Sequence, residues 1–113
     1  MFIYRNISVK KATLSITDDQ SAELAELFRL MGDASRLKIV VACLSKPRCV
    51  SDIAAETRLS PSLVSHHLRL LRATRMLRAD RKGKQVFYVA TDDHVRCVIS
   101  DMVAHIAEVE SLD

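Results

Sequence analysis

Tryptophan is absent from this 113-residue chain, and glycine, proline and aromatic residues are scarce: two Gly, two Pro, three Phe and two Tyr. Alanine, leucine, valine and isoleucine are plentiful, and 49% of the residues are hydrophobic. A composition poor in turn formers and rich in small and aliphatic residues favours a mainly helical fold. The length is sufficient for one hydrophobic core and too short for two.

Long apolar runs are also missing. No segment approaches the run of about 18 apolar residues that spans a membrane, and the N-terminus lacks an apolar core with a small-residue cleavage site. We therefore expect a cytoplasmic protein with no membrane partner. Cys43, Cys49 and Cys97 are an odd number in a reducing compartment, so they are core residues, ligands or redox groups rather than a disulfide framework.

Internal repeats, low-complexity tracts and Gly/Ser linkers are absent too. This predicts a single domain over residues 19–113, preceded by a polar N-terminal arm over residues 1–18. No glycine-rich phosphate loop, nucleophile or catalytic base pair stands out, so we expect that the protein is not an enzyme.

Charge is unevenly distributed, although the formal net charge is only +3. Seven bases and one acid lie between Arg69 and Lys84, whereas six acids and one base, Arg96, follow from Asp92 onward. The basic segment suits a polyanion such as nucleic acid and the acidic segment suits a cation, although an ordinary solvated surface also has these compositions.

Two helices are predicted after the arm. The i, i+3, i+4, i+7 spacing of apolar residues is typical of an amphipathic helix, and the residues are Leu24, Leu27, Phe28 and Met31. Gly32 can end this helix. Asp33 can cap a second helix, which runs through "ASRLKIVVACLS" to the break at Pro47.

A helix-turn-helix follows. Ser51 is the expected N-cap of a short third helix, "DIAAET", which leads through "RLS" into "PSLVSHHLRLLRAT". Ser60 can cap this fourth helix, and Pro61 suits its first position because that position needs no backbone donor. Two helices joined by about three residues are typical of the helix-turn-helix.

The fourth helix has two separate stripes. Val64, Leu68 and Leu71 form an apolar stripe, and His67 lies toward it and is expected to be packed. The polar stripe consists of Ser62, Ser65, His66, Arg69 and Arg72. Hydroxyls near the helix start can approach base edges or phosphates and the arginines can neutralise the DNA backbone, so we expect this stripe to bind DNA.

A β-hairpin is predicted next, in "MLRADRKGKQVFYVA". Two β-prone runs flank the turn segment "DRKGKQ" with Gly83. A hairpin directly after a helix-turn-helix is a wing. Its basic residues, Arg81, Lys82 and Lys84, are expected to reach phosphates or the minor groove.

The segments "LMGDASRLKIVVACL", "CVSDIAAETRLSPSLVSHHLRLLRATRML" and "RADRKGKQVFYV", together with the final helix, resemble the ArsR/SmtB family of metal-responsive winged-helix repressors. The resemblance covers roughly residues 22 to 110. It implies a mainly α (α+β) winged helix-turn-helix with a two-stranded wing and N- and C-terminal dimerisation helices. It also implies a homodimer that binds an inverted repeat in operator DNA and leaves it on sensing a ligand. By motif position, Ser62, Ser65 and His66 are the recognition-helix contacts.

The last segment, "DDHVRCVISDMVAHIAEVE", has two histidines eleven residues apart. His94 and His105 share a helix face but are separated by about 16 Å of helix axis. Zinc binds nitrogen at about 2.0 Å, so an ion held by both histidines must bridge two chains. An antiparallel pair of helices about a two-fold axis provides this, with two equivalent sites.

Two carboxylates complete the predicted set. Glu108 lies one turn beyond His105, and Asp92 is expected at or just before the helix start, where its backbone can turn inward. Asp92 and His94 of one subunit with His105 and Glu108 of the other make a closed tetrahedron that suits Zn(II), with Co(II) as a substitute and Ni(II) or Cd(II) as poorer candidates. The pattern is similar to the family's fifth-helix zinc site, which implies that zinc relieves repression.

A second metal or thiol site at Cys49 and Asp52 is a weaker alternative. In relatives with a site at the third helix, these positions bind metal together with Cys or His from the arm, and this arm has neither. The main alternative function is a thiol-based sensor on the same fold, with Cys43, Cys49 or Cys97 oxidised or persulfidated. By the pattern alone, Cys43 belongs to the core and Cys97 to the core or the dimer interface.

Overall fold

The computed structural model describes residues 14–112. In chain order the elements are α2 (Asp18–Met31), α3 (Ala34–Ala42), α4 (Val50–Thr57), α5 (Pro61–Ala73), β1 (Leu77–Lys82), β2 (Gln85–Ala90) and α6 (Asp93–Leu112). Five helices and one antiparallel hairpin in this part of the chain are the predicted mainly α winged helix-turn-helix. Residues 1–13 of the predicted arm lie outside the described residues, and α2 begins at the arm's last position, Asp18.

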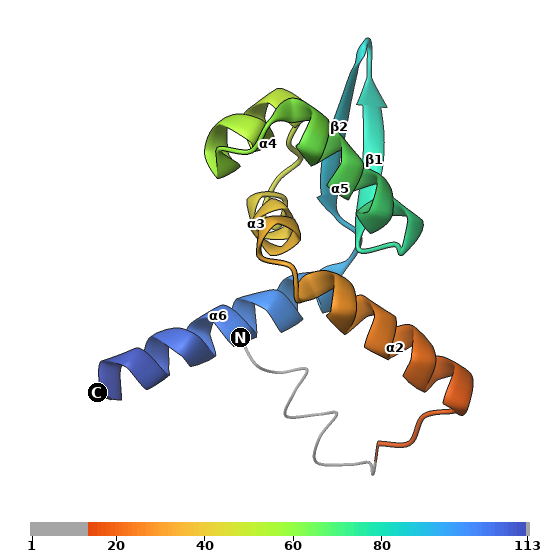
Figure 1. The fold of residues 1–113 in the computed structure, drawn as a ribbon, viewed down its shortest axis with the longest axis vertical. Coiled ribbons are helices and arrows are strands. Elements are labelled where there is room, and N and C mark those ends of the chain that lie inside the picture. The colour runs from red at the N-terminus through yellow and green to blue at the C-terminus, as the bar shows by residue number, and fades with distance from the viewer. Residues whose placement is uncertain (1–13, 113) are drawn as a thin grey trace.

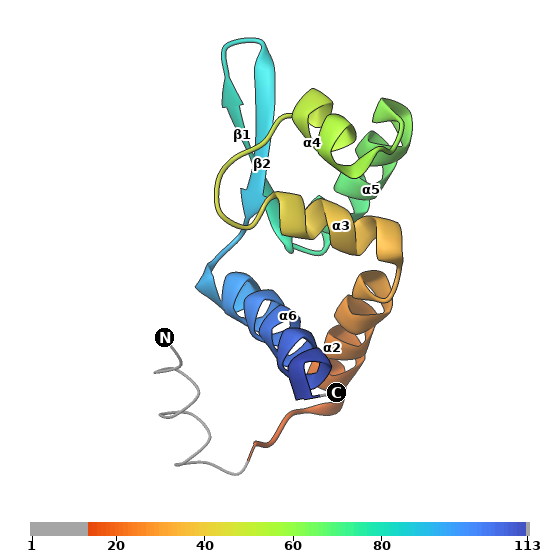
Figure 2. The same ribbon diagram turned by 90° about the vertical axis from the view of Figure 1, so that its left-hand side faces the viewer.

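The elements divide between two ends of the molecule. Figures 1 and 2 show α4, α5 and the hairpin at one end and α2 and α6 at the other, with α3 between them. We call α3, α4, α5 and the hairpin the winged unit, and α2 and α6 the outer helices.

Side-chain caps start three of the four helices that precede the hairpin. Thr17 accepts a hydrogen bond from the Gln20 backbone N–H, and the Gln20 side chain accepts one from Thr17. Asp33 caps α3 by accepting from the Arg36 N–H at 2.9 Å, as predicted. Ser60 caps α5 with Pro61 in its first turn, which is also confirmed. Each such cap satisfies a backbone donor that the helix leaves unpaired.

Two of the predicted helix boundaries are wrong. The N-cap of α4 is Cys49 rather than Ser51, and α3 ends at Ala42 rather than near Pro47. Both changes have one physical cause, since this loop is bonded to β2. Arg48 and Tyr88 exchange backbone hydrogen bonds of 2.9 and 2.8 Å, and the Ala90 N–H donates to the Cys43 carbonyl. Those tertiary bonds end α3 early and let α4 start as soon as the chain leaves the bridge.

The core lies within the winged unit. Its largest fully buried side chains are Ile39, Ile53, Leu68, Leu71, Leu77, Val40, Val64 and Cys43. They come from α3 and its C-cap residue Cys43, from α4 and α5, and from β1, so the helix-turn-helix and the base of the hairpin form one packed body. Burying each large aliphatic side chain contributes about 1.5 to 3 kcal/mol.

The hairpin is in antiparallel register from Leu77 opposite Ala90 to Lys82 opposite Gln85. Only Gly83 and Lys84 lie between the strands, so the turn is shorter than the six-residue segment that the sequence indicates. Gly83 has a φ of +64°, in the left-handed region that favours glycine. Among the described residues, no helix is long and apolar enough to cross a membrane.

Candidate nucleic-acid interface and metal site

The helix-turn-helix consists of α4 and α5 joined by three residues, Arg58, Leu59 and Ser60. Arg58 ends α4 in a left-handed conformation, with φ of 63°, and its N–H donates to the Ala54 carbonyl. This conformation reverses the chain within three residues. It fixes the start of α5 relative to α4, and Ile53 and Ala54 bury the inner face of α4.

The two stripes of α5 are on the faces that the sequence predicts. Val64, Leu68 and Leu71 are at most 1% exposed and hold the helix to the core. The polar stripe is exposed along its whole length: Ser62, Ser65, His66, Arg69 and Arg72. A rigid helix with a solvent-facing row of hydroxyl, imidazole and guanidinium groups has the donors that DNA recognition uses.

His67 is the buried polar residue of α5, as predicted, at 7% exposure. Burial lowers the pKa of His67; the Asp33 carboxylate opposes this effect, and the neighbouring Arg36 and His66 add to it. Its Nδ1 is buried without a hydrogen-bond partner in the described part of the chain. His67 is therefore a neutral packing residue, not a base reader.

The hairpin extends the same basic surface. Arg81 and Lys82 end β1 and Lys84 lies in the turn, and all three are exposed. Figure 1 shows the hairpin projecting past α4 and α5 at the end of the molecule. Cations at the tip of a projecting hairpin suit contact with phosphates, which contribute most of the salt-dependent affinity for DNA.

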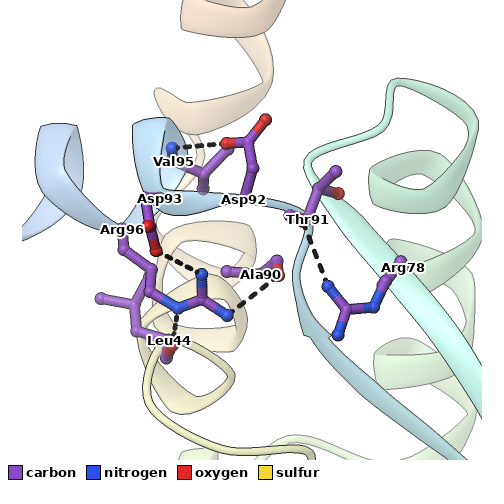
Figure 3. A network of polar contacts seen from close by, with 8 residues as sticks. All are labelled: Leu44, Arg78, Ala90, Thr91, Asp92, Asp93, Val95 and Arg96. Carbon is purple, nitrogen blue, oxygen red and sulfur yellow. Dashed lines mark hydrogen bonds and ion pairs between the residues drawn. The ribbon is translucent and has the colours of Figure 1, made fainter.

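Asp92 lies immediately before α6, where the sequence expects it, and it caps that helix. Its Oδ1 accepts a hydrogen bond from the Val95 N–H at 3.1 Å, and its second oxygen points away from Val95 (Figure 3). Capping therefore occupies one oxygen and orients the other. An oriented carboxylate is a suitable ligand for a metal ion.

The other three predicted ligands, His94, His105 and Glu108, are all exposed and lie on one uninterrupted helix, α6. At 100° per residue they fall within about 60° of one another around the helix axis. The rise of about 1.5 Å per residue separates the two histidines by about 16 Å. Within the described residues of one chain, no group of three or more His, Cys, Asp and Glu is placed to hold a metal ion. One subunit thus does not bring the four donors together.

An exposed apolar stripe adjoins these donors on α6. Its members are Val98, Met102, Ile106 and Val109, each between 44% and 55% exposed. On the other outer helix, Phe28 is 62% exposed. Apolar stripes of this kind at helical spacing are typical of helix–helix interfaces.

The cysteines occupy three environments. Cys43 is fully buried, as expected for a core residue, and burial raises the pKa of its thiol to about 12, which disfavours the reactive thiolate. The Cys49 Sγ lies 3.2 Å from the Ser51 Oγ, while Asp52 is exposed. Cys97 is half-buried in α6.

Arg78 and Arg96 have polar contacts to which the sequence assigned no role. Arg78 donates to the Thr91 carbonyl, and Arg96 donates to the carbonyls of Leu44 and Ala90. Backbone carbonyls leave no sequence pattern, so the available signal is weak: Arg96 is a cation in the first turns of a helix, where the helix dipole favours anions.

Comparison with known proteins gives a consistent result. A family model described as "Bacterial regulatory protein, arsR family" matches residues 33–79. The "Transcriptional repressor SmtB homolog" of Synechocystis sp. is 38% identical over 90 residues, which are 80% of this chain and 68% of that protein. The "Cadmium resistance transcriptional regulatory protein CadC homolog" of Staphylococcus aureus is 31% identical over 105 residues, 92% and 87% of the two chains. The crystal structure of the AntR antimony-specific transcriptional repressor is similar with a TM-score of 0.77 and 29% identity, over 92% of this chain and 95% of that one.

Proposed function

The chain belongs to the ArsR/SmtB family of bacterial transcriptional regulators, and from this premise we propose that it is a zinc-responsive repressor. The metal-free homodimer binds an inverted repeat in operator double-stranded DNA. Zn(II) binding between the C-terminal helices of the two subunits releases the DNA. One observation carries the proposal: His94 and His105 share a face of α6 beside an exposed apolar stripe, too far apart for one ion in one chain.

Operator binding is assigned to α5 and the hairpin. Ser62, Ser65 and His66 near the start of α5 contact base edges, and cations further along neutralise phosphates: Arg69, Arg72, Arg81, Lys82 and Lys84. The exposure of all eight side chains supports this assignment. A two-fold dimer presents two such helices to two half-sites, which accounts for an inverted repeat.

Dimerisation is assigned to the outer helices. The apolar stripe of α6 and exposed residues of α2, among them Leu24 and Phe28, are large side chains that a second subunit would remove from water. Pairing two α6 helices antiparallel through this stripe places His94 of one subunit opposite His105 of the other. The donors then lie at the edge of the interface, since they adjoin the stripe.

The donor set fits zinc by its chemistry. Two imidazole nitrogens and two carboxylate oxygens match a four-coordinate site, with Co(II) as a substitute and Ni(II) or Cd(II) less suited. Bound zinc would supply a cross-link between subunits. Asp92 and His94 of one subunit would hold the ion on the side nearest the hairpin, and His105 and Glu108 in the distal turns of α6 would complete the other subunit's half of the site.

Repression and sensing are linked because both depend on how the two winged units are oriented. If zinc favours an orientation that misplaces the two α5 helices, each ligand weakens the other by the same coupling free energy. The weaker alternative site, formed by Cys49 and Asp52, is not needed for this response. The direction of the effect is that operator affinity falls as zinc is added.

The test is operator binding followed by fluorescence anisotropy while zinc is titrated. We expect zinc to reduce affinity by about 5- to 150-fold, with about two ions per dimer because of the two-fold symmetry. The variant His105→Ala should lose the response while retaining metal-free operator affinity. Zinc-independent affinity in the parent, or an equal response in His105→Ala, contradicts the proposal.

A matched pair of substitutions tests the carboxylate. Glu108→Gln should weaken zinc binding, whereas Glu110→Gln, the same change two residues along on a different face of α6, should not. Zinc affinity is measured by competition with a chromophoric chelator in the absence of DNA. Equal losses in the two variants would indicate a general charge effect in place of a specific ligand.

A further inference from the structure

The segment Ala90–Asp93 joins β2 to α6, and we call it the joint. It is the short connection between the hairpin and the helix that carries all the proposed histidine ligands. The joint contains Asp92 and lies one residue before His94. Any displacement of this half of the metal site must therefore pass through the joint to reach the winged unit.

Backbone hydrogen bonds hold the joint to the winged unit from two sides. The Ala90 N–H donates to the Cys43 carbonyl at 3.0 Å, and the Thr91 N–H donates to the Met76 carbonyl at 3.2 Å. The first bond reaches the end of α3, and the second reaches the chain between α5 and β1. The joint is thus fastened to the segment that follows the recognition helix.

Arg96 adds a side-chain clamp with three partners, one in the loop after α3 and one at each end of the joint. Its Nε donates to the Leu44 carbonyl at 2.9 Å, and one terminal nitrogen donates to Asp93 at 3.0 Å. The other terminal nitrogen makes a longer contact, 3.4 Å, with the Ala90 carbonyl (Figure 3). A planar guanidinium with donors in fixed directions holds these three groups in one geometry, which no other side chain can reproduce.

Arg78 fastens the opposite side of the joint. It projects from β1 and donates to the Thr91 carbonyl at 3.1 Å (Figure 3). Consecutive carbonyls, those of Ala90 and Thr91, are therefore each held by an arginine from a different element. The start of α6 cannot turn relative to the hairpin without breaking these bonds.

The rest of α6 is less buried than its first turns. Beyond Ile99, the side chains described on this helix are exposed or half-buried. The chain thus ties the Asp92 and His94 half of the proposed metal site to the winged unit, while His105 and Glu108 lie on the distal part that extends away from it (Figure 1). A displacement of the Asp92 and His94 half of the proposed metal site would therefore be transmitted to the winged unit more directly than a displacement of the other half.

We propose that Arg96 is a positioning residue that couples the metal site to DNA binding, by making the joint rigid enough for zinc binding at the start of α6 to reorient the winged unit. This inference rests on the proposed function and deepens it. Arg96 touches neither metal nor DNA in this role. Its removal should therefore leave each ligand's own affinity nearly intact and reduce only their mutual effect.

The experiment measures the full cycle for the parent and Arg96→Gln: operator affinity with and without zinc, and zinc affinity with and without operator. In the variant we expect both single affinities to remain within about threefold of the parent's, while the zinc-induced loss of operator affinity falls toward onefold, which is no effect. Arg96→Lys retains the charge and one donor position, and should give an intermediate coupling. Lys46→Gln, the loss of an exposed cation two residues after Leu44, is the matched control and should keep full coupling.

A metal-free measurement separates positioning from metal chemistry. Amide hydrogen exchange at Ala90, Thr91 and Val95 should be faster in zinc-free Arg96→Gln than in the parent, because the joint opens locally. If Arg96→Gln does not fold, the same comparison is made with Arg96→Lys.

The outcomes are distinguishable. A parent whose operator affinity does not respond to zinc overturns the proposed function and the inference together. If the parent responds to zinc and both Arg96→Gln and Arg96→Lys retain the parent's coupling, only the inference is overturned. Amide exchange in the joint that is as slow in the Arg96 variant as in the parent also overturns the inference, because Arg96 would then not stabilise the joint.

Discussion

The winged unit and the outer helices differ in how much of their apolar surface each buries within the single chain. Almost all buried side chains belong to the winged unit, whereas among the described residues α2 contributes only Leu30 and α6 only Ile99. The radius of gyration is 15.6 Å, against about 13 Å for a compact chain of this length. One part of the molecule forms its core by itself, and the other presents apolar helices outward.

This difference separates two tasks along one short chain. A packed winged unit keeps the exposed stripe of α5 in a fixed geometry, which base recognition needs. In the proposed function a second subunit completes the outer helices, and the dimer can adopt more than one arrangement, which sensing needs. Four substitutions, in order of expected effect, test the contrast.

The largest effect should come from the core of the winged unit. Leu71→Ala should lower the free energy of unfolding by about 2 to 5 kcal/mol, because it leaves a cavity at a fully buried position. Leu63→Ala is the matched control on the same helix, where the side chain is 39% exposed, and should cost less than about 1 kcal/mol. Chemical denaturation at one protein concentration measures both. Similar losses would contradict the assignment of the core.

Substitutions in the outer helices should affect the folding of the single chain little and dimerisation strongly. Met102→Glu should raise the dimer dissociation constant by about 100-fold, or about 2.8 kcal/mol, because the new carboxylate would lose its hydration in the interface. Circular dichroism should be almost unchanged, since Met102 is 55% exposed in the single chain. Ser100→Glu adds the same charge on the opposite face of α6 as a control. Sedimentation that shows equal dimerisation in all three proteins would refute the α6 interface.

A smaller effect is expected at the exposed polar stripe of α5, which we propose binds DNA. Arg69→Ala should reduce the slope of log affinity against log salt by about one for each subunit, because binding then neutralises one phosphate fewer and releases fewer counterions. Arg29→Ala removes an exposed arginine of α2 that pairs with Glu26 and should leave the slope unchanged. Anisotropy at several salt concentrations measures the slope. An equal change in both variants would show a non-specific charge effect.

The smallest effect concerns pH. Burial lowers the pKa of His67 below its ordinary value of 6.5, so the unfolded chain takes up a proton at a higher pH than the folded chain does. This contribution to stability is complete above pH 6.5 and is lost as the pH falls toward the folded pKa. His67→Leu should therefore lose less stability between pH 7.5 and 5.5 than the parent, and the exposed neighbour His66 supplies the control, His66→Leu. A pH dependence identical in parent and His67→Leu would contradict this assignment.

Much of the fold was predictable because its signals are local. Asp33 and Ser60 cap helices as the sequence indicates, and Val64, Leu68 and Leu71 are buried as their spacing requires. Ser51 failed as a predicted cap because the choice was not local. Backbone bonds between Arg48 and Tyr88, forty residues apart, set where α4 begins.

The candidate site divides in the same way. The eleven-residue spacing of His94 and His105 is enough to limit a shared ion to a dimer, and the four-ligand metal site remains a prediction. Arg96 had no comparable signal, because its partners are carbonyls that any residue possesses, one of them 52 positions away.

The sequence by itself determined the helix-turn-helix, the basic hairpin and the single-faced histidine helix, because 3.6-residue periodicity, capping residues and turn residues act over a few positions. Only the tertiary structure decided how that helix is fastened. Its first turns are held by Arg96, Arg78 and the loop after α3, and those contacts depend on which backbone groups folding brings within hydrogen-bonding distance.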